Sequence, residues 1–316
     1  MKSVLLSVLL LPAIAFAQNF PSKPIRLLVP FGPGGVADIS ARFVAPKVSQ
    51  ALGQTMVIEN KPGAGGIVAA QEVARAAPDG YTLLLISNAN AVSKALFKTL
   101  PYDPEKDFAM ISNLGFFPLV ILADPKSPLR AVRDIVAEAK RNPGKLNAGT
   151  IAIGSTQNLA AELFKSTAGI DVQVVPYKAT GEVVTAAKSG DASFVFENLA
   201  PALSHIKSGN LRAIAVTGAK RFPALPDVPT VIESGLPGYD VASWNGFAAP
   251  AKTPRAVIDR LQQEIAKAVA DADVQKRFTE LGIEGRASTP EQLLDFYQAE
   301  SRRWTRVVEA AGIPKQ

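Results

Sequence analysis

The sequence of 316 residues contains no cysteine and only one histidine, His205. Without cysteine, the chain can form no disulfide bond, no thiolate zinc site and no cysteine nucleophile. The cysteine that carries the lipid anchor of some exported proteins is missing for the same reason. A single histidine also leaves no cluster of the usual transition-metal ligands. We therefore expect no metal ion and no cofactor.

Basic residues interleaved with aromatic ones, the usual mark of a nucleic-acid-binding surface, are missing as well. The 34 Lys and Arg residues modestly exceed the 28 Asp and Glu residues and are scattered along the chain. Their densest group, at 140–145, is typical of a solvated helix end. We expect no nucleic-acid partner, whereas a mildly positive field favours the capture of small anions.

The chain begins with the pattern of a secretory signal peptide. Lys2 supplies the positive start, residues 4–14 are almost all apolar, and Ala15 and Ala17 are the small residues that a signal peptidase reads. The apolar run is shorter than the roughly 20 residues of a membrane-spanning helix, and no later run is longer. We predict cleavage near Ala17 and a mature protein that is periplasmic and not embedded in the membrane.

After this segment, short β-rich runs alternate with helical patterns. Apolar runs bounded by turn residues predict strands at 25–31, 55–60, 81–87, 118–124, 145–151, 172–177, 192–198 and 212–218. Apolar residues spaced three and four apart predict helices at 36–52, 67–77, 131–142, 155–169, 182–190, 255–282 and 290–312. This order favours right-handed βαβ units and an α/β fold of two doubly wound domains. Because no low-complexity linker is present, we expect the chain to cross between the domains on ordered strands.

The stretch PFGPGG at 30–35 lies between the first predicted strand and the first predicted helix. Glycine-rich backbone exposes its N–H groups and lets an anion approach closely. The helix N-terminus behind it adds about half a positive charge. The turn therefore predicts a cradle for a carboxylate or phosphate, although a tight turn without a ligand would use the same residues.

The same turn satisfies the pattern G-x-G-x-x-A through Gly32, Gly34 and Ala37, and Glu59 follows about 20 residues on, as in dinucleotide-binding proteins. Export, a proline within the turn and a second glycine loop at 60–66 argue against that interpretation.

Ser204 to Lys207 match S-x-x-K, a signature of some serine enzymes. The partner motifs S-D-N and K-T-G and the G-x-S-x-G elbow are not in the sequence, so we interpret this segment as the end of a surface helix. We predict no catalytic residue and expect that the protein is not an enzyme.

A binding protein is the third interpretation. Polar loops follow predicted strands at 86–90, 149–158 and 176–182, and in an α/β fold such loops gather at the carboxyl ends of the strands. Loops of two domains would then face each other across a cleft. Ser155 and Thr156 are also good helix N-caps, a role that is compatible with binding an anion.

Taken in order, these motifs resemble the tripartite tricarboxylate transporter substrate-binding proteins, also called Bug-type periplasmic receptors. The resemblance covers the mature chain and rests on residues 23–42, 53–66, 77–85, 154–164, 175–182 and 225–254 and the two terminal helices. It implies a type II-like periplasmic-binding-protein clamshell with a hinge. We place 18–122 and 246–316 in domain 1 and 123–245 in domain 2.

The resemblance also implies a function. Such a receptor captures a small carboxylate, either a di- or tricarboxylate or an aromatic carboxylate, in the interdomain cleft and delivers it to the permease subunits in the membrane. We expect a monomer. An exported enzyme, or a receptor that hands its ligand-bound form to a sensor, remains the alternative.

Two facing loops, 31–38 and 154–158, would hold the carboxylate, and further side chains would contact the rest of the ligand. The predicted binding residues are Phe31, Gly32, Pro33, Gly34, Gly35, Ala37, Asp38, Ser87, Asn88, Ser155, Thr156, Gln157, Asn158, Tyr177, Lys178, Thr180, Glu197 and Trp244. Among them, Phe31, Tyr177 and Trp244 would pack on an apolar ligand body, or else pack in the core or hinge.

The sequence departs from the family pattern at a few positions. Asn158 stands where His is common, Glu197 and Ser193 stand where Asp is common, and PYKATGE at 176–182 replaces a PYKG turn. If Glu197 points into the cleft, it would disfavour a second carboxylate and favour an amine or hydroxyl. The departures leave the identity of the ligand open.

Overall fold

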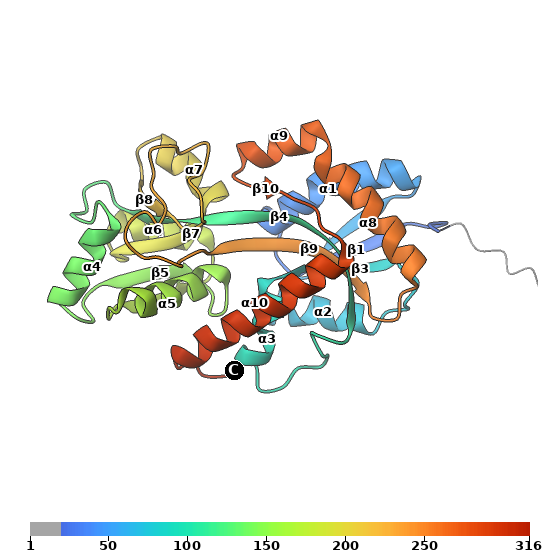
Figure 1. Cartoon of the computed structure of the whole chain (residues 1–316), viewed down its shortest axis with the longest axis horizontal. Helices are drawn as coiled ribbons and strands as arrows, with labels where there is room; N and C mark the ends of the chain where they lie inside the picture. The colour runs from blue at the N-terminus through green and yellow to red at the C-terminus, as the bar shows by residue number, and fades with distance from the viewer. Residues whose placement is uncertain (1–19) are drawn as a thin grey trace, which may run out of the picture.

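The computed structural model describes residues 20–316 and places their strands in one ten-stranded sheet (Figure 1). The first lobe is built on three parallel strands, with β1 hydrogen-bonded to β2 on one side and to β3 on the other. Its elements in chain order are β1 (Ile25–Val29), α1 (Val36–Leu52), β2 (Met56–Asn60), the short 3-10 helix η1 (Ala64–Gly66), α2 (Ile67–Ala74), β3 (Thr82–Ser87) and α3 (Asn88–Leu96).

The second lobe repeats this plan, with β5 hydrogen-bonded in parallel to β6 and to β7. Buried aliphatic side chains of these strands pack against the helices that follow them. Its elements are α4 (Val132–Arg141), β5 (Asn147–Ile151), α5 (Thr156–Ala168), β6 (Gln173–Tyr177), α6 (Thr180–Ser189), β7 (Phe194–Asn198), α7 (Leu199–Lys207) and β8 (Arg212–Val216).

Two long antiparallel strands, β4 (Phe108–Ala123) and β9 (Ala242–Pro250), run between the lobes (Figure 1). The first part of β4 pairs with β9 and with the short β10 (Glu284–Gly285), whereas its last residues pair with β7 and β8. The chain therefore crosses between the lobes on ordered strands, as the sequence predicts. We refer to these crossing strands as the hinge, because they connect the lobes. The predicted domain limits at 122/123 and 245/246 stay a prediction.

The C-terminal part contributes α8 (Arg255–Ala270), α9 (Ala272–Glu280) and α10 (Pro290–Ala310). The prediction of one helix over 255–282 is wrong, because Asp271 is extended and caps α9 by accepting hydrogen bonds from the amides of Asp273 and Val274. Asp271 ends one helix and starts the next, which a purely periodic pattern does not reveal.

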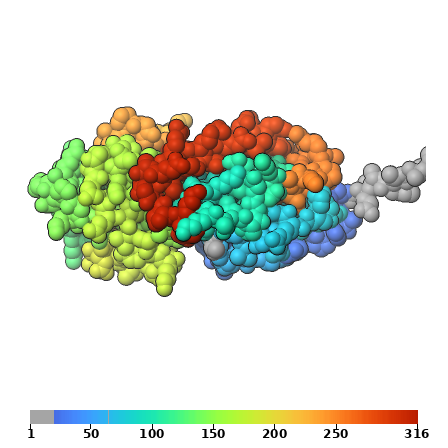
Figure 2. Space-filling view, turned by 90° about the horizontal axis from the view of Figure 1, so that it is seen from below, coloured from blue at the N-terminus to red at the C-terminus, as the bar shows by residue number. Residues whose placement is uncertain are grey.

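Helix α10 packs against both lobes. Near its start, Leu293 and Tyr297 belong to the core of the first lobe, and near its end Trp304 and Val308 join the core of the second. Figure 2 shows the red C-terminal segment lying against the yellow-green surface of the second lobe and the teal surface of residues near 100. This helix and the two crossing strands tie the lobes together.

Three further segments differ from expectation. The stretch at 86–90 is not a loop, because α3 begins at Asn88, where the Ser87 amide donates to Asn90 Oδ1 at 3.0 Å in a capping interaction. The strand β4 begins at Phe108 rather than at 118, and β9 is not among the predicted strands. Both crossing strands are buried along most of their length. They therefore lack the alternating polar residues by which a half-exposed strand is recognised in a sequence.

The hinge leaves no space for a side chain at Gly246 on β9. A Cβ atom there would lie 2.9 Å from the backbone oxygen of Ser112 on β4 and 3.0 Å from Cδ2 of Leu293 on α10. We expect Gly246→Ala to lower the free energy of unfolding by about 1–3 kcal/mol, because overpacked sites strain their neighbours. Urea denaturation measures this loss, with Gly218→Ala as the control, since its nearest neighbour atom lies at 3.8 Å. Equal stability of the two variants would contradict the close approach of the crossing strands.

Candidate functional site

A cavity of about 680 Å³ lies between the two lobes. It opens at the carboxyl ends of parallel strands of both lobes, where binding sites of open α/β sheets occur. The N-termini of α1 and α3 line it from the first lobe, and those of α5, α6 and α7 line it from the second. Residues from β4 and β9, including Phe117, Ser243 and Asn245, form the wall on the hinge side.

Most of the predicted site residues line this one cavity. The lining includes Phe31, Gly32, Pro33, Gly34, Gly35, Ala37, Ser87, Asn88, Ser155, Thr156, Gln157, Lys178 and Thr180. The structure thus brings together segments that are far apart in the sequence. Whether they bind the ligand stays a prediction.

The two loops that carry the helix N-termini are built in the same way. Gly34 and Gly154 both have positive φ angles, 82° and 80°, which glycine adopts without strain. The Gly34 amide donates to Asp38 Oδ2 at 2.9 Å, and the Gly154 amide donates to Asn158 Oδ1 at 3.1 Å. In each loop, therefore, the side chain four residues further on accepts a hydrogen bond from the glycine amide and fixes the turn into the helix. We call this contact the brace of the loop.

These internal bonds decide which amides remain for a ligand. The amides of Gly34 and Ser155 are taken, the latter by the Ala152 carbonyl at 3.0 Å. The first-turn amides of a helix have no partner within the helix, and in α1 and α5 several of them belong to residues that line the cavity, among them Val36 and Thr156. Together with the helix dipoles, they make two positive sites that face one cavity.

Asp38 supports the first loop instead of lining the cavity. Its side chain is only 2% exposed, and it accepts hydrogen bonds from Gly34, from Arg42 Nε at 2.9 Å and from Asn60 Nδ2 at 2.8 Å. Burial raises the pKa of Asp38, but the bonds from Arg42, Gly34 and Asn60 outweigh burial and bring the pKa below its usual value. The charge of Asp38 is balanced by Arg42, so it does not oppose an anionic ligand.

Glu197 lies behind the second-lobe wall of the cavity. Its side chain is completely buried, and Oε1 accepts hydrogen bonds from Gln157 Nε2 at 2.9 Å and from the Asn198 amide at 2.7 Å. Burial raises the pKa of the Glu197 carboxyl group, and hydrogen bonding from Gln157, the Asn198 amide and Thr180 opposes the rise without cancelling it. Glu197 thus orients two residues that line the cavity and does not line it itself.

The remaining predicted residues outside the lining are Asn158, Tyr177 and Trp244. Asn158 braces the second loop. Tyr177 packs against an apolar cluster of the second lobe, and Trp244 is completely buried beside Phe296 and Tyr297 of α10. Trp244 thus packs in the core, because β9 turns this side chain toward α10, and its contact with a ligand stays a prediction.

Several lining residues were not predicted. They include Asn198, Ser243, Asn245, Phe117, Ile39 and Leu281. Most of them lie at strand ends or on the two crossing strands. The sequence signal for Asn198 is its position as a polar residue at the end of a buried strand, immediately before a helix.

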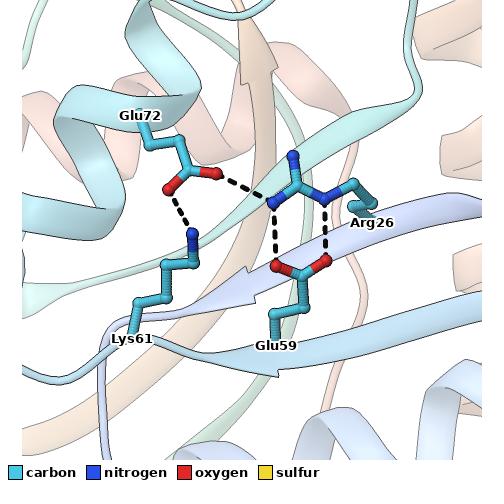
Figure 3. A network of polar contacts seen from close by, with 4 residues as sticks. All are labelled: Arg26, Glu59, Lys61 and Glu72. Carbon is cyan, nitrogen blue, oxygen red and sulfur yellow. Dashed lines mark hydrogen bonds and ion pairs between the residues drawn. The ribbon is translucent and has the colours of Figure 1, made fainter.

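The acidic residue of the possible dinucleotide site has another role in the structure. Glu59 forms a bidentate pair with Arg26, with Nε to Oε1 at 2.7 Å and Nη2 to Oε2 at 2.8 Å, and Glu72 joins Arg26 to Lys61 (Figure 3). The acidic residue that a dinucleotide site would use therefore ties β2 to β1, and Glu72 extends this network to α2.

Other features of enzymes or metal sites are likewise not found at the cavity. Ser204 and His205 belong to α7, Ser204 is exposed, and neither residue lines the cavity. Among residues 20–316, no group of three or more acidic or histidine side chains is placed to hold a metal ion.

The sequence is similar to those of known proteins. The family described as the tripartite tricarboxylate transporter family receptor matches residues 40–313. The protein BugT of Bordetella pertussis is 36% identical over 94% of this chain and 91% of its own length.

Two solved structures are similar over almost their whole length. An R. palustris protein solved with adipate has a TM-score of 0.86 and 32% identity, covering 94% of this chain and 100% of its own. MatC from Rhodopseudomonas palustris with bound malate has a TM-score of 0.81 and 32% identity, covering 92% and 100%. The predicted clamshell of two α/β lobes is confirmed by these similarities.

The signal-peptide prediction, with cleavage near Ala17, falls outside the described residues. In the part of the chain that the structure does describe, no helix is both long enough and apolar enough to cross a membrane.

The brace at Asp38 makes a pH-dependent prediction. We expect Asp38→Asn to lower the free energy of unfolding at pH 7 by about 1–3 kcal/mol, because charge-assisted hydrogen bonds are lost. Since the pKa of Asp38 is lowered in the folded state, its contribution is complete above the unfolded value of about 3.9 and is lost as pH falls through the folded value. The deficit should therefore shrink as the pH falls below about 4.

Urea denaturation across this pH range measures the effect. Asp259→Asn is the matched control, because Asp259 pairs with Arg255 at the same helical spacing but its side chain is 43% exposed, and such pairs contribute less than about 1 kcal/mol. A deficit for Asp38→Asn that equals the control, or that does not change with pH, would contradict the role of the brace.

Proposed function

Because the chain belongs to the tripartite tricarboxylate transporter receptor family of periplasmic solute-binding proteins, we propose that it binds a small carboxylate between its lobes and delivers it to a membrane permease. The observation that carries this proposal is the matched pair of braced loops on opposite sides of one cavity. Each loop directs the N-terminus of a helix, with its free amides, at the space between the lobes.

This arrangement suits an anion that is removed from water. A carboxylate buried without partners is costly, and hydrogen bonds from amides to an ionised carboxylate are stronger than those between neutral groups. Only a closed clamshell lets α1 and α5 contact one ligand together, so the ligand favours the closed form over the open one.

The cavity wall offers apolar surface that can contact the carbon skeleton of a ligand. Phe31, Ile39 and Phe117 give it apolar surface, and Lys178 is the one charged side chain among the described lining residues. The adipate and malate in the two related structures support carboxylates as the ligand class. Lys178 would attract a second carboxylate where the ligand has one.

The remaining parts of the proposal rest on family membership and on the N-terminal sequence pattern. From the family we infer periplasmic action and permease subunits of a tripartite tricarboxylate transporter as the partner, and from the first residues we infer cleavage near Ala17. We also propose that the protein acts as a monomer. The proposed role is binding without catalysis.

A thermal-shift screen of the protein lacking residues 1–17 against mono-, di- and tricarboxylates identifies the ligand. At 100 times its dissociation constant, the ligand adds about 2.7 kcal/mol to the free energy of unfolding.

A proline at position 156 tests the role of the α5 amides. Thr156 is the first residue of α5, a position where proline is well tolerated, and Ser155 before it already has the extended conformation that proline requires (φ −64°, ψ 157°). Thr156→Pro removes one amide donor, while Thr156→Ala removes the same side chain and keeps the amide. We expect the proline variant to bind the carboxylate about 10- to 100-fold more weakly than the alanine variant, as for a lost charge-assisted hydrogen bond.

Isothermal titration calorimetry with the carboxylate found in the screen measures both affinities. The melting temperatures of the two ligand-free variants should agree, because proline at this position removes no intrahelical hydrogen bond. Equal affinities of the two variants would contradict an amide contact at α5.

A further inference from the structure

The second-lobe wall of the cavity presents an amide oxygen whose orientation is fixed from behind. Gln157 is only 2% exposed and lines the cavity, and its Nε2 donates to Glu197 Oε1 at 2.9 Å. The Asn198 amide donates to the same oxygen at 2.7 Å. Because this carboxyl oxygen receives two donors, it acts as an acceptor, and Gln157 must turn its nitrogen toward it. The carbonyl oxygen of Gln157 is then the group left for the cavity.

Two other lining residues have buried oxygens without a partner. Asn198 Oδ1 and Asn88 Oδ1 accept no hydrogen bond from the described residues. Asn88 is 2% exposed, and its nitrogen donates to Thr156 Oγ1 at 3.4 Å, which turns its oxygen away from that contact. One of these residues belongs to the first lobe and the other to the second.

Glu197 itself does not line the cavity, so its carboxyl group is not an acceptor for the ligand. Buried acceptors without donors are uncommon, and each costs free energy unless a ligand or water supplies the donor. A carboxylate cannot supply it, because it is itself only an acceptor. The amides of α1 and α5 therefore donate to the carboxylate of a ligand, whereas the oxygens of the wall need a hydrogen-bond donor from another part of the ligand.

We propose that the ligand carries a hydrogen-bond donor, a hydroxyl or an ammonium group, in addition to its carboxylate, and that the Gln157 oxygen accepts from it. The oxygens of Asn198 and Asn88 are buried in this structure and join only after their side chains rotate toward the cavity. This inference rests on the proposed function and narrows its ligand class to hydroxy- or aminocarboxylates. Glu197 is a positioning residue here, because it orients Gln157 without lining the cavity.

The test compares carboxylates that differ in one substituent. Each set has an unsubstituted acid, its 2-hydroxy acid and its 2-amino acid: succinate, malate and aspartate; propanoate, lactate and alanine; 3-phenylpropanoate, 3-phenyllactate and phenylalanine. Calorimetry with the protein lacking residues 1–17 gives each affinity. In any set that binds, we expect the hydroxy or amino member to bind at least about tenfold more tightly than the unsubstituted one, and the comparison of those two members distinguishes hydroxyl from ammonium.

A variant tests whether Gln157 causes the preference for the hydroxy or amino ligand. Gln157→Met keeps the length of the side chain and removes the amide, so the ratio between substituted and unsubstituted ligand should fall to about threefold or less. Ser243→Ala is the control, because Ser243 lines the same cavity and its hydroxyl contacts Thr156 at 3.0 Å. It should change the affinities of all members of a set by a similar factor. Melting temperatures without ligand show whether each variant is folded.

The outcomes separate the two proposals. Unsubstituted acids that bind as tightly as their substituted partners would overturn this inference, with water filling the acceptors, and would leave the proposed function intact. An unchanged ratio in Gln157→Met, or equal loss of ratio in Ser243→Ala, would overturn the assignment to this wall. Failure of every carboxylate to bind would overturn the proposed function, and this inference with it.

Discussion

The site depends on one local interaction that occurs once in each lobe. A glycine amide with a positive φ angle donates to a side-chain oxygen four residues further on, from Gly34 to Asp38 and from Gly154 to Asn158. The bond fixes the turn between strand and helix, so that the helix presents its first free amides in one direction. Because both lobes direct these amides at the same cavity, the chemistry of the site comes from backbone that is held in place by side chains.

The two braces differ in charge, and their surroundings differ accordingly. Asp38 is ionised and pairs with Arg42, so the first loop is held by an ion pair as well as by hydrogen bonds. Asn158 is neutral and needs no counter-ion. In the second lobe the charged group is Glu197, which is buried behind the wall and fixes the orientation of Gln157. One lobe thus uses its carboxylate to shape a loop, and the other uses its carboxylate to orient a side chain of the cavity wall.

The sequence predicts the local features of this fold better than the long-range ones. Short strands between helices and the glycine turn at 30–35 were recognisable because turn residues bound them. The crossing strand β9 was not, since it is almost entirely buried and has no alternating pattern. The limit between α8 and α9 was missed because the apolar spacing continues across Asp271.

The same division holds for the site. Residues of the glycine loops and of the helix starts line the cavity as the motifs indicate, and their role in binding stays a prediction. Trp244 could not be placed from the sequence, because only the packing of α10 against β9 decides which way it points. Ser243 and Asn245 beside it reach the cavity for the same reason.

The central claim is that α1 and α5 hold one carboxylate together and thereby close the lobes. Helices α8 and α9 pack in the core of the first lobe, whereas α7 belongs to the second. The chain has no cysteine, so spin labels can be attached at the exposed positions Lys207→Cys on α7 and Lys276→Cys on α9. Distance measurement by pulsed electron paramagnetic resonance should show a shorter and narrower distribution when the carboxylate binds. A control pair within the first lobe, at Lys252→Cys and Lys276→Cys, should not change. An interlobe distance that stays the same at saturating ligand would contradict the account.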